Sequence, residues 1–202
     1  MKFRGIALLL CGICIGVYIV QVALPSFTDF IALEQEKWSQ PWRPITALFA
    51  HGSMSHLLYN LLALALFGSI LEVLVGGRKM LGIFLATGIG ANVLALLIYP
   101  SSLGASGAIF GIIGTLVVLR PSMVVFAFGL PMPMLLAALL WAIGDIIGVF
   151  IPSKVGNTAH LAGLVLGLIC GALFHKPTTQ QLRPKIVLDE KSMRDWEDRY
   201  VR

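Results

Sequence analysis

Long apolar runs alternate with short polar segments along this chain. A helix that crosses the hydrocarbon core of a bilayer needs about 20 mostly apolar residues, so the pattern predicts six membrane-spanning helices. Their expected bounds are about Gly5–Leu24, Ser55–Val75, Met80–Tyr99, Ser106–Leu119, Pro131–Phe150 and Thr158–Phe174. The first run is longer than the apolar region of about 7 to 15 residues in a signal peptide, and we therefore expect it to be a retained helix.

Two polar intervals are too long to be simple connections. Residues 25–54 combine tryptophans with charges and prolines, which is typical of a folded loop at the membrane–water interface. Residues 176–202 form a polar tail that begins with a linker, Lys176–Lys185. Apolar side chains then recur at helical spacing, at Met193, Trp196 and Tyr200. A short amphipathic helix on a membrane surface or a partner fits this spacing, and a solvated tail fits it equally.

Composition supports a membrane location. Of the 202 residues, 57% are hydrophobic and 12% are charged, whereas soluble domains carry about 25% charged residues. The chain is therefore expected to be an all-α, multi-pass integral membrane protein of a cell or plasma membrane, surrounded by the lipid bilayer. Its net charge of +5 is spread over short loops and the tail, so no nucleic-acid partner is expected.

The basic residues also predict the orientation. Lys and Arg precede the first predicted helix, join the second to the third, follow the fourth and recur in the tail. The alternate loops contain only Lys37, Arg43 and Lys154. The positive-inside rule then places both termini in the cytoplasm. We expect one membrane domain over residues 1–175 and a cytoplasmic tail over residues 176–202.

Four polar side chains within the predicted helices suggest a catalytic site. His56 and Asn60 are four residues apart and therefore share a helix face, while Ser106 and His160 lie at or near the start of their helices. The expected topology brings all four toward the outer ends of their helices. Because polar groups in a membrane are costly and usually functional, we predict Ser106 as a nucleophile and His160 as its general base.

Glycines predict that the helices of Ser106 and His160 touch. Each helix carries small residues at spacings of three or four, which allow close approach of backbones in lipid. They are Gly107, Gly111 and Gly114 on one helix, and Gly163, Gly167 and Gly171 on the other. A close crossing would bring Ser106 and His160 within hydrogen-bond reach.

Stabilisation of an oxyanion can also be assigned from the sequence. The backbone N–H of Ser106 is expected to be free because first-turn amides lack partners within the helix. The side chains of His56 and Asn60 can supply further donors. His51 precedes the second helix and is expected to be structural. Glu72 and Asp145 are expected to form hydrogen bonds between helices.

Two other protease chemistries do not fit. The His-Glu-x-x-His motif of a zinc protease is absent, and Asp145 is the only aspartate in the middle of a predicted span, whereas an aspartyl protease needs a carboxylate pair. No metal and no cofactor are therefore predicted.

The same residues resemble the rhomboid family of intramembrane serine proteases, from Trp42 to about Gly171. The resemblance rests on Trp42-Arg43, His51-Gly-Ser-Met-Ser-His56-Leu-Leu-Tyr-Asn60, Gly68-Ser-Ile-Leu-Glu72, Gly104-Ala-Ser106-Gly-Ala-Ile-Phe-Gly111 and Ala159-His160-Leu-Ala-Gly163-Leu-Val-Leu-Gly167. Phe110 stands where many relatives carry a tyrosine stacked on the catalytic histidine, and this change retains the ring.

The resemblance implies a six-helix bundle, a Ser–His dyad without a third acid, and a gate formed by the fifth helix and its following loop. It also implies that the substrates are transmembrane proteins. We therefore predict an intramembrane serine endopeptidase that cleaves transmembrane segments near the outer face. Two alternatives remain: a small transporter or proton relay that uses His56, His160 and Asp145, and a non-catalytic chaperone of membrane helices.

Overall fold

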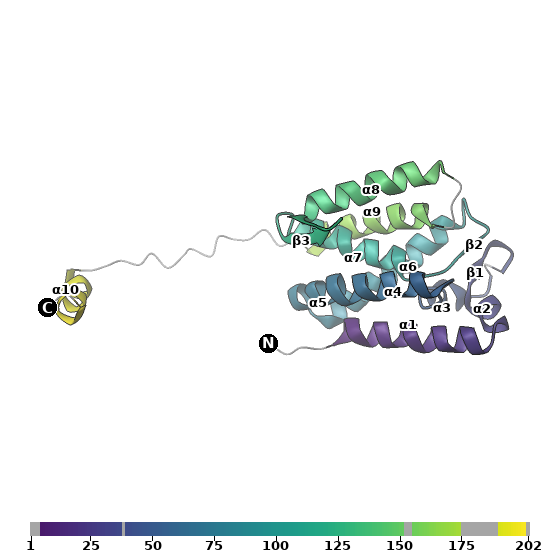
Figure 1. Cartoon of the computed structure of the whole chain (residues 1–202), viewed down its shortest axis with the longest axis horizontal. Helices are drawn as coiled ribbons and strands as arrows, with labels where there is room; N and C mark the ends of the chain where they lie inside the picture. Colours follow the sequence, from purple (N-terminus) through teal and green to yellow (C-terminus); the bar gives the residue numbers. More distant parts are fainter. Residues whose placement is uncertain (1–4, 38, 152–154, 175–189, 201–202) are drawn as a thin grey trace.

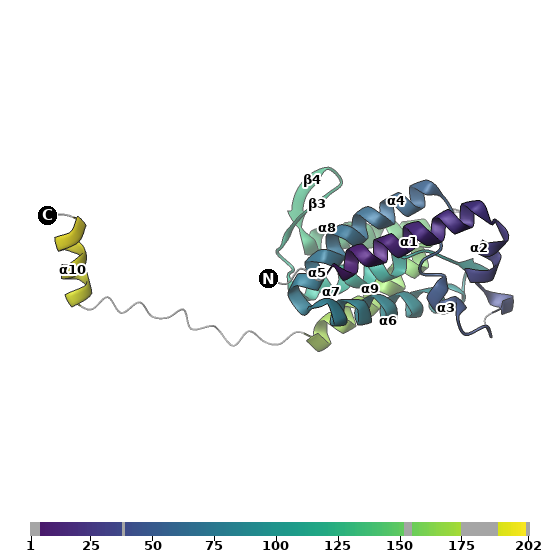
Figure 2. The same ribbon diagram turned by 90° about the horizontal axis from the view of Figure 1, so that it is seen from below.

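The computed structural model describes residues 5–37, 39–151, 155–174 and 190–200, and it is mostly helical (Figure 1). The long helices lie side by side, with short irregular segments at both ends of the bundle (Figures 1 and 2). They are α1 (Ile6–Ala23), α4 (Met54–Ala63), α5 (Ser69–Val75), α6 (Gly77–Ala95), α7 (Ser106–Leu119), α8 (Met134–Val149) and α9 (Asn157–Phe174).

One expected helix is formed by three consecutive elements. A π-helical segment, η2 (Leu64–Gly68), joins α4 to α5, and together they run continuously from Met54 to Val75. Among the described residues, Ile6–Ala23, Met54–Val75 and Asn157–Phe174 are long and apolar enough to cross a membrane. The shorter helices α7 and α8 are also apolar. The chain is therefore a multi-pass integral membrane protein.

The predicted fifth helix is wrong at its start. Helix α8 begins at Met134, and Pro131 lies instead in a hairpin of β3 (Val124–Ala127) and β4 (Leu130–Pro133). Phe128 and Gly129 form its two-residue turn with φ values of 54° and 79°, the pair of positive values that a tight type I′ hairpin turn requires. Periodicity does not distinguish a strand from a helix within an apolar run, so the sequence does not predict the hairpin.

Helix α7 forms the centre of the bundle, and ten of its 14 residues are buried. It packs against α6, α8 and α9. A Cβ atom added at Gly163 or Gly167 would lie 2.0 or 2.1 Å from the carbonyl oxygen of Gly107 or Gly111, respectively. The predicted close packing of two glycine-bearing helices is therefore confirmed, and it brings α9 onto the backbone of α7.

Helix α1 is tied to α5 by the carboxylate of Glu72. Its two oxygens accept hydrogen bonds from the backbone N–H groups of Ile6 and Ala7, at 3.2 and 3.0 Å. These amides belong to the first turn of α1 and lack partners within that helix. The expected interhelical role of Glu72 is confirmed.

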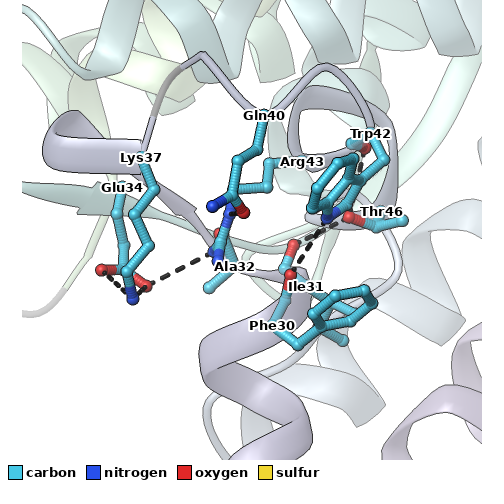
Figure 3. Close-up of polar contacts among 9 residues, drawn as sticks. All are labelled: Phe30, Ile31, Ala32, Glu34, Lys37, Gln40, Trp42, Arg43 and Thr46. Carbon is cyan, nitrogen blue, oxygen red and sulfur yellow. Dashed lines mark hydrogen bonds and ion pairs between the residues drawn. The ribbon is translucent and has the colours of Figure 1, made fainter.

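The interval after α1 is folded, as predicted, into α2 (Ser26–Ile31), β1 (Leu33–Glu34), the 3₁₀ turn η1 (Gln35–Lys37) and α3 (Arg43–Thr46). Arg43 is buried at its centre (Figure 3). Its guanidinium donates to Gln40 Oε1 at 2.7 Å and to the carbonyl of Ala32. Trp42 stacks on Phe30, with ring centroids 5.7 Å apart. Arg43 and Trp42 thus join distant parts of one loop.

The tail contains one described helix, α10 (Glu190–Tyr200). Met193, Trp196 and Tyr200 are exposed on it, and the rings of Trp196 and Tyr200 lie 6.0 Å apart. The predicted helix is present, and whether it lies on a membrane, on a partner or in solvent stays a prediction. The linker predicted at Lys176–Lys185 lies outside the described residues.

Candidate active site

The segment before Ser106 is held by the folded loop between α1 and α4. Strand β2 (Ser101–Ser102) pairs antiparallel with β1, with Ser102 opposite Leu33. Two residues later, the N–H of Gly104 donates to the carbonyl of Ala47 at 2.8 Å. The Ser102 hydroxyl donates to Asn92 Oδ1 on α6 at 2.9 Å. Three anchors therefore position the start of α7.

Gly104 allows the chain to pass directly beneath the ring of His56. Its φ of 117° is a conformation that side chains with a Cβ rarely adopt. A Cβ at this position would also lie 2.7 Å from His56 Cε1 and 2.9 Å from Nε2. The imidazole of His56 thus lies against the backbone two residues before the candidate nucleophile.

Ser106 is the first residue of α7, as the sequence predicts, and it is partly exposed. At this position its backbone N–H precedes the hydrogen-bonded turns of the helix. The hydroxyl and the amide of one residue are therefore both available at the helix start. A helix N-terminus also favours a developing negative charge.

His160 lies over the face of α7 that carries Ser106. Its imidazole stacks on the ring of Phe110, with centroids 4.4 Å apart and planes inclined by 4°. Phe110 follows Ser106 by four residues and therefore shares its helix face. Among the described residues, the Ser106 hydroxyl forms no direct hydrogen bond with His160. In unliganded enzymes such contacts often tighten only when substrate binds.

A carboxylate contacts the candidate base from the other side. Asp145 Oδ1 on α8 lies 2.9 Å from His160 Nδ1. Both side chains are largely buried, with exposed fractions of 9% for Asp145 and 14% for His160. The expected interhelical role of Asp145 is confirmed. The resemblance implies a Ser–His dyad without a third acid, and in this chain a carboxylate nonetheless contacts the candidate base directly.

His56 and Asn60 lie together on α4. Ser53 caps this helix by accepting a hydrogen bond from the N–H of His56 at 3.1 Å. The buried amide of Asn60 donates through Nδ2 to the carbonyl of His56 at 2.8 Å. A primary amide has two N–H groups, so the second N–H of Asn60 is not required for this contact.

His51 supports His56 from behind. Their rings meet edge to face, with centroids 5.1 Å apart. Gln21 on α1 accepts a hydrogen bond from the N–H of His51 and donates to its carbonyl, at 3.0 and 3.3 Å. Burial, reinforced by the neighbouring imidazole of His56, lowers the pKa of His51 from 6.5 to about 4. His51 is therefore neutral at neutral pH, which fits the expected structural role.

Other features of the structure lie away from this site. Within the described ranges, no three His, Cys, Asp or Glu side chains gather into a potential metal site. A pocket of about 570 Å³ is lined by residues of α5 and by Arg120, Ser122 and Met123. Arg120, Ser122 and Met123 follow the C-terminal end of α7, whereas Ser106 is its first residue. The pocket thus contains none of the candidate catalytic groups.

Comparisons with known proteins find relatives of this chain. A family model described as Rhomboid domain matches residues 38–177. Rhomboid protease GlpG of Haemophilus influenzae is 31% identical over 182 residues, which cover 85% of this chain and 91% of that protein. Rhomboid protease GluP of Bacillus subtilis is 32% identical over 150 residues, or 72% of this chain and 28% of that protein. The chain thus spans nearly all of the first relative and only part of the second.

Proposed function

We propose, from the premise that this chain belongs to the rhomboid family, that it is an intramembrane serine endopeptidase that cleaves transmembrane segments of other membrane proteins. One observation carries the proposal. The imidazole of His160 stacks on Phe110, one turn from Ser106 on the same face of α7. This geometry supports the pairing of a potential base with a potential nucleophile at one end of the bundle.

In the proposed reaction, Ser106 Oγ attacks the scissile carbonyl while His160 Nε2 accepts the hydroxyl proton. His160 then donates that proton to the leaving amine, which leaves an acyl-enzyme. Water attacks the acyl-enzyme while His160 accepts a proton from it, and His160 returns this proton to Ser106 Oγ as the acid product leaves. The N–H of Ser106 and the side chains of His56 and Asn60 stabilise the oxyanion. No metal or cofactor takes part in this mechanism.

The proposed topology has six membrane spans, with both termini in the cytoplasm. The proposed location is the cell or plasma membrane. The 14 residues of α7 extend about 21 Å at about 1.5 Å per residue, which is shorter than a hydrocarbon core of about 30 Å. If Arg120 marks the cytoplasmic boundary, Ser106 lies about 10 Å below the outer surface. Water would reach it through a polar cavity open to the outside.

Active-site labelling tests the proposal. A fluorophosphonate should label the wild-type protein at Ser106, and Ser106→Ala and His160→Ala should each abolish labelling and cleavage of a reporter membrane substrate. Residues that act as one unit are strongly non-additive, so the double variant should be no worse than either single variant.

Competing functions give different results in the same experiment. A transporter or proton relay, or a chaperone of membrane helices, would show no labelling that depends on Ser106. Substantial cleavage by the folded Ser106→Ala protein would overturn the assignment of the nucleophile.

A further inference from the structure

The contact between Asp145 and His160 bears on where the imidazole proton lies. The 2.9 Å contact joins Asp145 Oδ1 to His160 Nδ1, and with an ionised carboxylate, whose oxygens only accept, Nδ1 must carry the proton. A neutral imidazole carries one proton. Its Nε2 then has a free lone pair, which is the group that a serine hydroxyl needs as a general base.

We propose that Asp145 is a positioning residue that keeps His160 in the Nδ1–H tautomer and presents Nε2 to Ser106. This proposal rests on the proposed protease function. Asp145 acts through His160 and contacts neither the nucleophile nor a substrate. The site is accordingly a Ser–His pair with a carboxylate behind the base.

Two contacts together restrict the imidazole. Stacking on Phe110 holds the plane of the ring, with an inclination of 4°, but a stacked ring can still flip by 180° about its Cβ–Cγ bond. Such a flip would exchange the positions of Nδ1 and Cδ2, and those of Nε2 and Cε1. The hydrogen bond to Asp145 Oδ1 needs Nδ1 on the side of α8 and therefore selects one of the two orientations.

The register of α8 against α9 places Asp145 where this contact forms. A Cβ on Gly148 would lie 2.6 Å from Asn157 Nδ2, so the buried Asn157 side chain packs onto the backbone of α8 there. Asp145 precedes Gly148 by three residues, and His160 follows Asn157 by three residues. Since α8 and α9 run in opposite directions, the contact of Gly148 with Asn157 on one turn places Asp145 opposite His160 on the next turn.

The environment of Asp145 also argues for more than packing. Its second oxygen, Oδ2, is buried and has no hydrogen-bond partner among the described residues. Burying a carboxylate with an incomplete set of partners is costly, and a neutral polar pair could hold two helices together at a lower cost. The carboxylate of Asp145 lies against the candidate base, where its charge stabilises the imidazolium that forms during proton transfer.

The first measurement needs no variant. In ¹⁵N-histidine-labelled wild-type protein, NMR should show His160 protonated at Nδ1, with its signal assigned by its loss in His160→Ala. An unprotonated Nδ1 in the neutral ring would overturn the proposal. This readout is independent of turnover, so it remains informative even if no protease activity is found.

The second measurement uses Asp145→Asn, which retains the shape of the side chain. An amide can donate to Nδ1 and thereby favour the wrong tautomer. We expect kcat to fall roughly 10- to 1,000-fold with KM changed by no more than about threefold, and the NMR signal to shift toward the Nε2–H form. Asp145→Glu should recover part of kcat because it restores the charge.

Asp29→Asn is the matched control, since Asp29 is an exposed carboxylate on α2. It should leave kcat and the His160 tautomer unchanged. If Asp145→Asn lowers thermal stability but leaves both kcat and the tautomer at wild-type values, Asp145 only joins two helices and the proposal is wrong. If wild-type protein shows the Nδ1–H form but no labelling of Ser106, the proposed function fails instead.

Discussion

At the scale of single residues, the candidate site includes polar groups that are held against backbone atoms. Asn60 is held by the carbonyl of His56, and His56 lies against Gly104. The sequence predicts the types and spacing of these residues, because polar groups are conspicuous in apolar helices. It does not predict that Asp145 reaches His160, since this depends on the rotation and register of two helices.

Loss of one oxyanion donor should slow the reaction without abolishing it. Removing a single such donor typically costs about 100- to 1,000-fold in kcat, and the Ser106 N–H would remain. Asn60→Ala should therefore lower the turnover rate by about 10- to 1,000-fold, less than Ser106→Ala does. His56→Ala should behave similarly. Steady-state cleavage of a reporter substrate measures both, and unchanged rates would leave only backbone amides in the oxyanion hole.

His51 should make the stability of the fold depend on pH. The unfolded chain takes up a proton on this residue near pH 6.5, whereas the folded protein does so only near pH 4. Between these values the unfolded state binds more protons, so the contribution of His51 to stability falls as the pH falls. The expected slope is about 1.4 kcal/mol per pH unit.

Unfolding measured from pH 7 to pH 4 in wild-type protein and in His51→Gln tests this dependence. Glutamine does not titrate in this range, so the variant should lose stability less steeply as the pH falls. Parallel curves for the two proteins would show that His51 is protonated equally in both states.

At the scale of helices, the glycine-lined contact between α7 and α9 is the most predictable part of the fold. Small residues at regular spacing on two helices identified it from the sequence, and carbonyl oxygens 2.0 and 2.1 Å from the ideal Cβ positions confirm it. The strand pairing of β1 with β2 was not predictable in this way. Its two-residue strands have no periodicity, and their partners are far apart in the chain.

Gly163→Ala and Gly167→Ala should push α9 away from α7. The obstructing atoms are backbone carbonyls of Gly107 and Gly111, which cannot move as side chains can. We expect a loss of about 1–3 kcal/mol, a lower Tm by about 2–10 °C, and at least about a tenfold loss of cleavage because His160 is displaced.

Gly82→Ala is a suitable control for both variants. Gly82 lies on α6, and among the described residues no atom beyond its chain neighbours and the nearby backbone of its own helix lies within 4 Å of its ideal Cβ position. In a helix interior, alanine is favoured over glycine by about 1 kcal/mol, so this variant should be at least as stable as wild type. Equal behaviour of all three variants would contradict the importance of the α7–α9 contact.

At the scale of the whole molecule, the sequence predicts the presence of several long apolar helices, which the structure contains, while the segments that connect them required the structure. The hairpin of β3 and β4 illustrates the reason. Its apolar residues continue the pattern of α8, so hydrophobicity alone assigns both to one helix. The hairpin brings Phe128 to Trp141 on α8, with ring centroids 6.0 Å apart.

Trp141 also joins α8 to the helix formed by α4, η2 and α5. Its ring meets Phe67 of η2 edge to face, with centroids 5.9 Å apart. We expect α8 to move away from this contact when a substrate helix enters sideways, since Ser106 would lie below the membrane surface. The same movement would carry Asp145 away from His160 and leave the base without its orienting carboxylate until α8 returns.

Linking α8 to η2 should therefore separate access of a membrane substrate from reactivity of the site. We propose Phe67→Cys with Trp141→Cys, in protein whose cysteines at positions 11, 14 and 170 are replaced by alanine, joined by a short bifunctional thiol reagent. The linked protein should lose nearly all cleavage of a transmembrane reporter. It should retain labelling of Ser106 by a small water-soluble fluorophosphonate, because in the proposed topology water reaches the site from the outer side. The unlinked double variant is the control for loss of the two rings. Unchanged cleavage after complete linkage would mean that substrates enter elsewhere, and failure of the reagent to label Ser106 in unlinked protein would contradict the water-accessible cavity.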